Sequence, residues 1–230
     1  MTMQFRTKEE QVADFLREGI ISGRYPRGAR LKQQEIANLL STSITPVREA
    51  LKLLEAEGYV TGDSYRGATV APFDIEASTE VLGLRILLET QLVRGAVDHA
   101  SGADIAELKV MSGEFARAYE AGDNETARAA NYRFHHRMFE IARMPQTLHF
   151  VQILWARYPF DLINRLTGRV SRAAQEHDDM LAAIIAGDAA AAMLATRQHV
   201  EAGWKELRDA IEAERAAQPQ AKSRKARTKA

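Results

Sequence analysis

The hydrophobic positions of the first 58 residues recur at helical spacing in three segments. Residues 7–10 form a Thr-x-x-Glu capping box, whose two side chains satisfy the first free amides of a helix, and apolar positions then continue to Gly23. A second segment spans residues 33–40. A third begins at Thr45-Pro46, where proline is tolerated in a first turn, and stops at Gly58. The pattern therefore predicts three short helices.

Residues 59–70 have a different pattern. β-Branched and aromatic side chains lie on both sides of a turn that contains glycine and aspartate, which predicts a hairpin. Three short helices followed by a hairpin is the order of a winged helix-turn-helix, and Ala71-Pro72 forms a natural linker after it. The third helix should bury one apolar face and leave a polar, net basic face outward; the apolar positions are Val47, Ala50, Leu51 and Leu54.

Residues 74–214 show no strand signal and keep helical spacing throughout. Helix breaks are predicted at Ser101-Gly102, which opens a capping box with Asp104, and at Gly122-Asp123, Pro145, Thr167-Gly168 and Gly187-Asp188. About six helices of about 15 to 25 residues with short connections predict an antiparallel bundle. The expected fold class is mainly α, with a winged helix-turn-helix at residues 1–72, an all-helical domain at 73–215 and a basic, disordered tail at 216–230.

Composition limits the chemistry that the chain can perform. The 230 residues include no cysteine, which excludes disulfides and thiolate metal sites and leaves histidine and oxygen ligands. No apolar run approaches the roughly 20 residues that span a bilayer, and the N-terminus has no signal-type apolar core, so we expect a cytoplasmic protein.

The formal charge of zero hides a gradient along the chain. Residues 1–72 carry 10 basic and 9 acidic residues, residues 73–217 carry 16 and 22, and residues 218–230 carry 5 and 0. Because the middle of the chain is acidic, any contact with DNA has to come from local patches in the first segment or from the tail. For the tail, a solvated and solubilising role is the alternative.

Two of the six histidines are adjacent, at His135 and His136. Neighbouring residues on a helix point about 100° apart, so the two rings face different surroundings. His135 shares the inward side with the apolar stripe of Phe134, Met138 and Ile141, and His136 falls among charged residues on a face that we expect to be solvated.

His177 and His199 have the same inward bias as His135, and Asn131 lies one turn before His135. These residues are either core histidines satisfied by hydrogen bonds or, together with the Asn131 oxygen, the ligands of a divalent metal. His99 and His149 have no such company and are expected to be structural or exposed.

The chain resembles the GntR family of bacterial transcription regulators, in the FadR-like subgroup with an all-helical FCD ligand-binding domain. The motifs that carry this resemblance in the first domain are Pro26-Arg-Gly-Ala-Arg-Leu31, Glu35-Ile-Ala37, Thr45-Pro-Val-Arg-Glu-Ala-Leu51, Leu54-Glu-Ala-Glu-Gly58 and Arg66-Gly67. In the second domain they are Arg85-Ile-Leu-Leu-Glu89, Phe134-His135, Glu176-His177 and His199.

The resemblance implies a homodimeric repressor that binds double-stranded operator DNA and responds to a small carboxylate bound over a divalent metal, zinc, nickel or manganese. It implies no membrane partner and no enzymatic activity. It assigns DNA contacts to Ser43, Thr45, Arg48, Arg66 and Gly67, and metal contacts to Asn131, His135, His177 and His199.

The chain departs from the family pattern at two positions. Ile44 stands where the family usually has an arginine before Thr-Pro, so the operator sequence should differ from the commonest one. Asn131 stands where many members have an aspartate, and its neutral oxygen should hold the metal more weakly while leaving more positive charge for a carboxylate effector.

The candidate effector contacts are Arg85, Trp155 and Tyr158, and each has a structural alternative. Arg85 pairs either with an effector carboxylate or with Glu89 one turn later. Trp155 and Tyr158 lie on an inward stripe and are either pocket wall or core.

Two other functions fit the same residues. One is a metal-dependent hydrolase, which would need a general base. We expect no carboxylate beside the three histidines, because Glu176 adjoins His177 but points about 100° away. The other is an architectural DNA-binding dimer without an effector.

Overall fold

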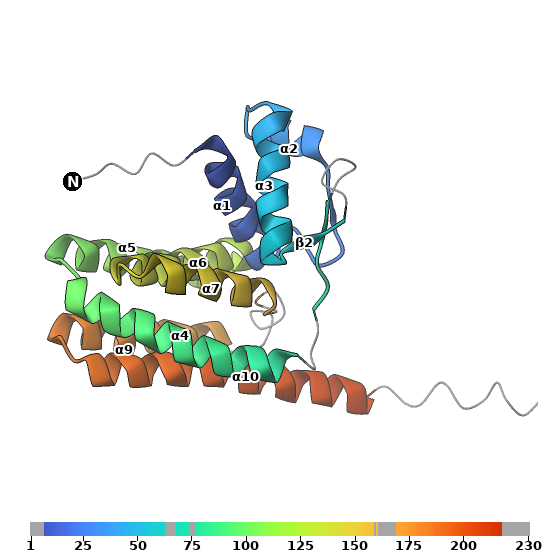
Figure 1. Ribbon diagram of the computed structural model, residues 1–230. Coiled ribbons are helices and arrows are strands. Elements are labelled where there is room, and N and C mark those ends of the chain that lie inside the picture. The colour runs from blue at the N-terminus through green and yellow to red at the C-terminus, as the bar shows by residue number, and fades with distance from the viewer. Residues whose placement is uncertain (1–6, 63–67, 74–76, 159, 161–168, 218–230) are drawn as a thin grey trace, which may run out of the picture.

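The computed structural model describes residues 7–62, 68–73, 77–158, 160 and 169–217 (Figure 1). Its first part, which we call the head, comprises α1 (Lys8–Ile21), β1 (Arg30–Leu31), α2 (Gln33–Leu39), α3 (Ile44–Glu57), β2 (Val60–Thr61) and β3 (Ala68–Val70). The second, which we call the body, comprises α4 (Ser78–His99), α5 (Gly102–Glu120), α6 (Asn124–Ile141), α7 (Pro145–Ala156), α9 (Arg169–Ala186) and α10 (Ala189–Ala217). The mainly α fold is confirmed.

Local signals explain where the helices of the head begin and end. The Thr7 hydroxyl accepts from the Glu10 amide, and the Glu10 carboxylate accepts from the Thr7 amide at 2.8 Å, so the predicted capping box is confirmed. α3 ends at Gly58, whose φ of +87° is the left-handed conformation that glycine adopts without a Cβ clash.

The head contains a three-stranded sheet in the order β1-β3-β2, with both pairs antiparallel. Val60 pairs with Val70, which confirms the predicted pairing across the hairpin, and Arg30 pairs with Thr69. β1 was not predicted, because a strand of two residues has no periodicity to detect. The turn residues 63–67 lie outside the described residues.

The helices of the body begin and end close to the predicted breaks. Ser101 caps α5 with a capping box to Asp104, Asp123 caps α6, and Pro145 opens α7. The predicted break at Thr167-Gly168 lies outside the described residues. The predicted helix length of about 15 to 25 residues was wrong for two helices: α7 is shorter, with 12 residues, and α10 is longer, with 29.

The body is a stack in which α4 packs against α10, and α5 packs against α6 and α9. The contact between α4 and the C-terminal end of α6 is close: a Cβ built on Gly95 would lie 3.0 Å from the Cβ of Ala142. Within the described ranges, no helix is both long enough and apolar enough to cross a membrane.

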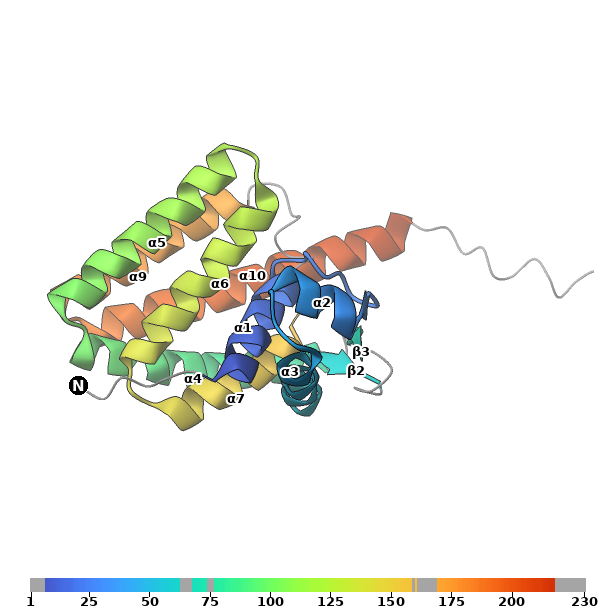
Figure 2. The ribbon, with the colours of Figure 1, turned by 90° about the horizontal axis from the view of Figure 1, so that it is seen from above.

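The head lies on the body, with α1 beside α6 and the C-terminal end of α3 beside α7 (Figures 1 and 2). A single cluster of buried apolar side chains continues through both parts. It includes Leu16, Leu51 and Tyr59 from the head and Phe134 and Val151 from the body. The two parts therefore share one core.

Candidate metal centre and DNA-binding face

Three histidines from three helices converge inside the body. His135 lies on α6, His177 on α9 and His199 on α10, and one ring nitrogen of each lies within 4.8 Å of the others. The Nε2 atoms of His135 and His177 are 3.1 Å apart. His177 is fully buried and the side chain of His199 is 12% exposed. The prediction that these three histidines lie on inward faces is confirmed.

The spacing of the ring nitrogens fits a shared ion. Two nitrogens bound at about 2.1 Å from one divalent metal, at angles of about 90° to 110°, would lie about 3.0 to 3.4 Å apart. The 3.1 Å separation of His135 and His177 falls within this range. Asn131 is buried one turn before His135 on α6, so the oxygen donor expected from the sequence lies on the same side of that helix.

Aromatic rings wall the histidine cluster. Phe134 stacks on the ring of His177 with centroids 4.5 Å apart, and Phe115 lies 4.9 Å from the same ring. These ring contacts restrict the rotation of the His177 imidazole.

The prediction that no carboxylate lies beside the histidines was wrong. Glu176 accepts a hydrogen bond from the Nδ1 atom of His199 at 2.6 Å, because α10 brings His199 to the side of α9 on which Glu176 lies. When Nδ1 carries the hydrogen, the lone pair of His199 is on Nε2, the form that binds a metal. Glu176 thus bonds the Nδ1 atom of His199, and leaves the Nε2 atom on the other side of the ring.

The three residues expected to contact an effector meet around Glu89. Arg85 donates from Nε to Glu89 Oε1 at 2.7 Å, and the Trp155 indole donates to the same oxygen at 2.9 Å. The Arg85 guanidinium lies 4.0 Å from the centre of the Tyr158 ring. We call these four residues the Glu89 cluster.

Arg85 forms the ion pair with Glu89, which is one of the two alternatives expected from the sequence. The pair lies deep inside the protein, with the two side chains 4% and 3% exposed. Burial is the largest single influence and lowers the pKa of Arg85, but Glu89 and Tyr158 together outweigh it and the net pKa is raised. Phe139 lies between this cluster and the histidines, with its ring centroid 5.9 Å from Trp155 and 6.2 Å from His135.

His136 is not on a solvated face, which corrects the expectation from the sequence. Its side chain is 15% exposed, and its Nε2 atom lies 2.9 Å from the side-chain nitrogen of Gln152 on α7. The neighbouring helix, which a helical wheel does not show, covers this ring. His99 is exposed and its Nδ1 atom bonds the carbonyl of Gly95 at 2.8 Å.

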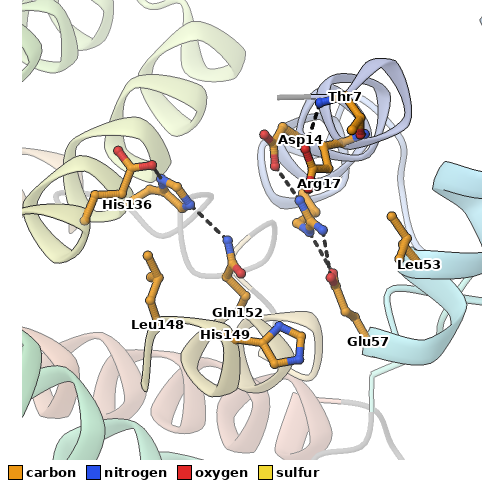
Figure 3. Close-up of a pocket in the computed structure, with 11 residues that line it drawn as sticks. Thr7, Asp14, Arg17, Leu53, Glu57, His136, Leu148, His149 and Gln152 are labelled. Carbon is orange, nitrogen blue, oxygen red and sulfur yellow. Dashed lines mark hydrogen bonds and ion pairs between the residues drawn. The ribbon is translucent and has the colours of Figure 1, made fainter. Parts of the chain in front are cut away.

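His136 and His149 line a cavity of about 490 Å³ between the head and the body (Figure 3). Its walls come from α1, α3, α6 and α7, and Arg17 lies between Asp14 and Glu57. Glu57 accepts two hydrogen bonds from Arg17 at 2.7 Å. Burial by itself lowers the pKa of Arg17. The hydrogen bond to Glu57 and the negative charge of Glu57 raise it by more than burial lowers it, so the net pKa of Arg17 lies above its ordinary value.

The outward face of α3 carries the residues expected to contact DNA. Val47, Ala50, Leu51 and Leu54 are fully buried, which confirms the predicted inner face, and Ser43 and Thr45 are exposed. Ser43 precedes the helix and makes no capping hydrogen bond through its side chain. Arg48 is half-buried. Arg66 and Gly67 lie outside the described residues.

The N-terminal end of α3 points away from the body. A Cβ built on Gly58 would lie 3.5 Å from the guanidinium of Arg157, so the C-terminal end of α3 is the end near α7. Ser43 and Thr45 therefore lie about 20 Å from that contact, given a rise of about 1.5 Å per residue.

Residues 8–70 match the family described as bacterial regulatory proteins of the gntR family, and residues 80–202 match the FCD domain. The HTH-type transcriptional regulator McbR of Escherichia coli (strain K12) is 30% identical over 67% of this chain and 72% of its own length. A probable D-xylose utilization operon transcriptional repressor of Paenarthrobacter nicotinovorans is 29% identical over 85% of this chain and 87% of its own.

Solved structures of similar proteins have the same fold. The structure of Escherichia coli McbR/YncC has a TM-score of 0.78 at 24% identity and covers 90% of this chain and all of that one. A putative transcriptional regulator from Rhodococcus sp. RHA1 has a TM-score of 0.66 at 24% identity, and covers 89% of this chain and 99% of that one.

Proposed function

Because the chain belongs to the gntR family of bacterial regulatory proteins and carries an FCD domain, we propose that it is a repressor whose operator binding is controlled by a small carboxylate held over a divalent metal. The family assignment makes it a DNA-binding transcription regulator and not an enzyme. The observation that carries the rest of the proposal is the convergence of His135, His177 and His199.

The metal ligands in this proposal are the three histidines and the Asn131 oxygen. Neutral imidazoles suit zinc, nickel and related ions, and an amide oxygen adds no charge to the site. A bound divalent ion would supply a Lewis-acid contact for a carboxylate. The Glu176 carboxylate fixes the ring of His199, and the aromatic walls restrict the rotation of His177.

In this proposal the Glu89 cluster responds to the effector, although Phe139 separates the cluster from the histidines. Arg85 already has a carboxylate partner in Glu89, so an effector that reached Arg85 would have to compete with this ion pair. We therefore propose the metal as the main contact of the effector carboxylate, with Trp155 and Tyr158 as wall residues.

DNA binding is assigned in this proposal to the free end of α3, through Ser43 and Thr45, and to Arg48 one turn further along it. A second copy of the chain would supply the second head for a two-fold operator, as is usual for helix-turn-helix proteins. Such a regulator acts in the cytoplasm, where its operator lies.

The test is elemental analysis of the protein purified without a histidine tag, beside His135→Ala and His136→Ala. His136 is the matched control, because it is the next residue on α6 and lies outside the histidine cluster. We expect close to one divalent ion per chain in the wild type and in His136→Ala, and loss of this ion in His135→Ala. Absence of metal from the wild type, or equal content in all three, would refute the metal site.

A further variant, Asn131→Asp, tests the fourth ligand. A carboxylate binds a divalent ion more tightly than an amide, so this variant should keep more of its metal after mild chelator treatment. If both proteins lose metal equally, Asn131 is not a ligand.

Small carboxylates are then screened for release of the protein from DNA. Release by a carboxylate distinguishes an effector-controlled repressor from an architectural dimer.

A further inference from the structure

Among the residues that the structure describes, polar contacts join the head to the body on two sides. On one side α1 and the turn after it meet α6, where Arg133 pairs with Glu18 and Arg24 pairs with Glu125, both at 2.8 Å. The side chains of Arg24 and Glu125 are 38% and 48% exposed, so this pair is largely solvated. The second side is the C-terminal half of α7, where the Tyr59 hydroxyl donates to the carbonyl of Gln152 at 2.8 Å and Arg27 contacts the helix end.

Arg27 makes the contact at the end of α7. Its Nη1 atom donates to the carbonyls of Ala71 and Ala156, at 3.1 and 3.0 Å, and its Nη2 atom donates to the carbonyl of Tyr158 at 3.0 Å. Ala71 follows β3 in the linker between head and body. One guanidinium therefore holds the head, the linker and α7 together.

The chemistry at this contact is specific to an arginine. The last carbonyls of a helix have no partner within the helix and form the negative end of its dipole, so they favour a cation. A guanidinium presents several N–H donors in one fixed plane, whereas a lysine ammonium is a single point charge. The planar fork of Arg27 therefore holds three carbonyls from two chain segments in a more fixed relation than a lysine would.

Tyr158 belongs both to this contact and to the Glu89 cluster. Its backbone carbonyl accepts from Arg27, and its ring lies against the guanidinium of Arg85, which pairs with Glu89. A change in the Glu89 cluster that shifts Tyr158 must therefore also shift the carbonyl that Arg27 holds.

We propose that Arg27 is a positioning residue that transmits the state of the Glu89 cluster to the orientation of the head, and so to its affinity for DNA. Two heads must keep a set separation to dock on a two-fold operator, so a small change of head orientation alters binding. The proposal extends the proposed function, since it names the route by which the body would control the head.

The experiment is a double-mutant cycle on DNA affinity, with no metal or effector added. A duplex is first selected from a random pool with the wild-type protein. Its dissociation constant is then measured by fluorescence anisotropy for the wild type, Glu89→Gln, Arg27→Gln and the double variant. Glu89→Gln perturbs the cluster without touching the head.

We expect Glu89→Gln to change the dissociation constant by about fivefold or more in the wild-type background, and by less than about twofold in the Arg27→Gln background. Arg27→Lys should keep part of the effect. An equal factor in both backgrounds, or no effect of Glu89→Gln in the wild type, would overturn the proposal.

Arg24→Gln is the matched control, because it is the same substitution three residues away from Arg27. It removes the ion pair with Glu125, which joins the head to α6 and not to α7. In its background the effect of Glu89→Gln should persist in full. Loss of the effect there too would mean that any loosening of the head suffices, and would count against Arg27.

Circular dichroism checks the fold of each variant. If Glu89→Gln does not fold, Trp155→Phe replaces it, since this substitution removes the indole donor to Glu89 while keeping an aromatic ring at the position. The metal content of each protein is measured separately. The affinity measurements can therefore refute coupling through Arg27 without refuting the metal site, and the metal analysis can refute the metal site without refuting the coupling.

Discussion

Side chains on α3 divide into those that hold the head together and those that face outward. Val47 and Leu51 are fully buried, whereas Thr45 is exposed and Arg48 is half-buried. The sequence carries Ile44 immediately before Thr45, and isoleucine cannot make the bidentate contact to guanine that arginine makes. In the function proposed above, Arg48 therefore carries more of the recognition than it would beside an arginine at position 44.

Replacing Arg48 by alanine should weaken binding to the selected duplex by about 10- to 100-fold, which is about 1 to 3 kcal/mol, because a base contact is lost. The matched control is Lys52→Ala, one turn later on the same face, whose amine bonds Glu49 at 2.9 Å. This control should change affinity less than about threefold. Titrations at several salt concentrations measure both, and equal effects of the two substitutions would show that Arg48 has no special role.

Among whole elements, α4 carries two glycines in opposite environments. A Cβ built on Gly83 meets nothing within 4 Å, whereas a Cβ on Gly95 would lie 3.0 Å from the Ala142 Cβ and 3.2 Å from its carbonyl oxygen. A glycine-to-alanine substitution at Gly83 therefore reports on helix propensity alone, whereas the same substitution at Gly95 also reports on packing against Ala142.

Gly83→Ala should raise the free energy of unfolding by about 0.5 to 1 kcal/mol, because alanine has less backbone freedom to lose in the unfolded chain. Gly95→Ala should lower it by about 1 to 3 kcal/mol, because α4 and α6 must move apart. Urea unfolding followed by circular dichroism measures both. A stabilised Gly95→Ala protein would mean that the two helices do not pack as closely as described.

Elements and inward faces were predictable from the sequence, whereas contacts between elements were not. The capping boxes at Thr7 and Ser101 involve residues three apart, so local pattern reveals them. The partners of His136 and Glu176 come from α7 and α10, and no single helix shows where its neighbours lie. The histidine cluster was predicted because each member lies on the apolar side of its own helix.

On the scale of the whole molecule, the shared core makes the head and the body one folding unit. Leu16 and Tyr59 in the head belong to the same buried cluster as Phe134 and Val151 in the body. Apolar burial across the junction means that unfolding either part exposes surface on the other.

Scanning calorimetry should therefore show one transition, with calorimetric and van't Hoff enthalpies that agree. Both tryptophans, Trp155 and Trp204, lie in the body, so loss of their native fluorescence should coincide with loss of total helix by circular dichroism. A separate earlier transition that leaves the fluorescence unchanged would mean that the head unfolds independently.

The contact of Arg27 with the end of α7 also bears on how such proteins can be recombined. The short linker that contains Ala71 is the obvious junction at which to exchange heads between relatives, because the chain passes there only once. A transplanted head, however, brings its own residue to the position of Arg27 and its own surface to face α7. Under the coupling proposed above, the exchangeable module is the head together with the end of α7, and a chimaera cut at the linker alone keeps the coupling only where the new head places an arginine against that helix end.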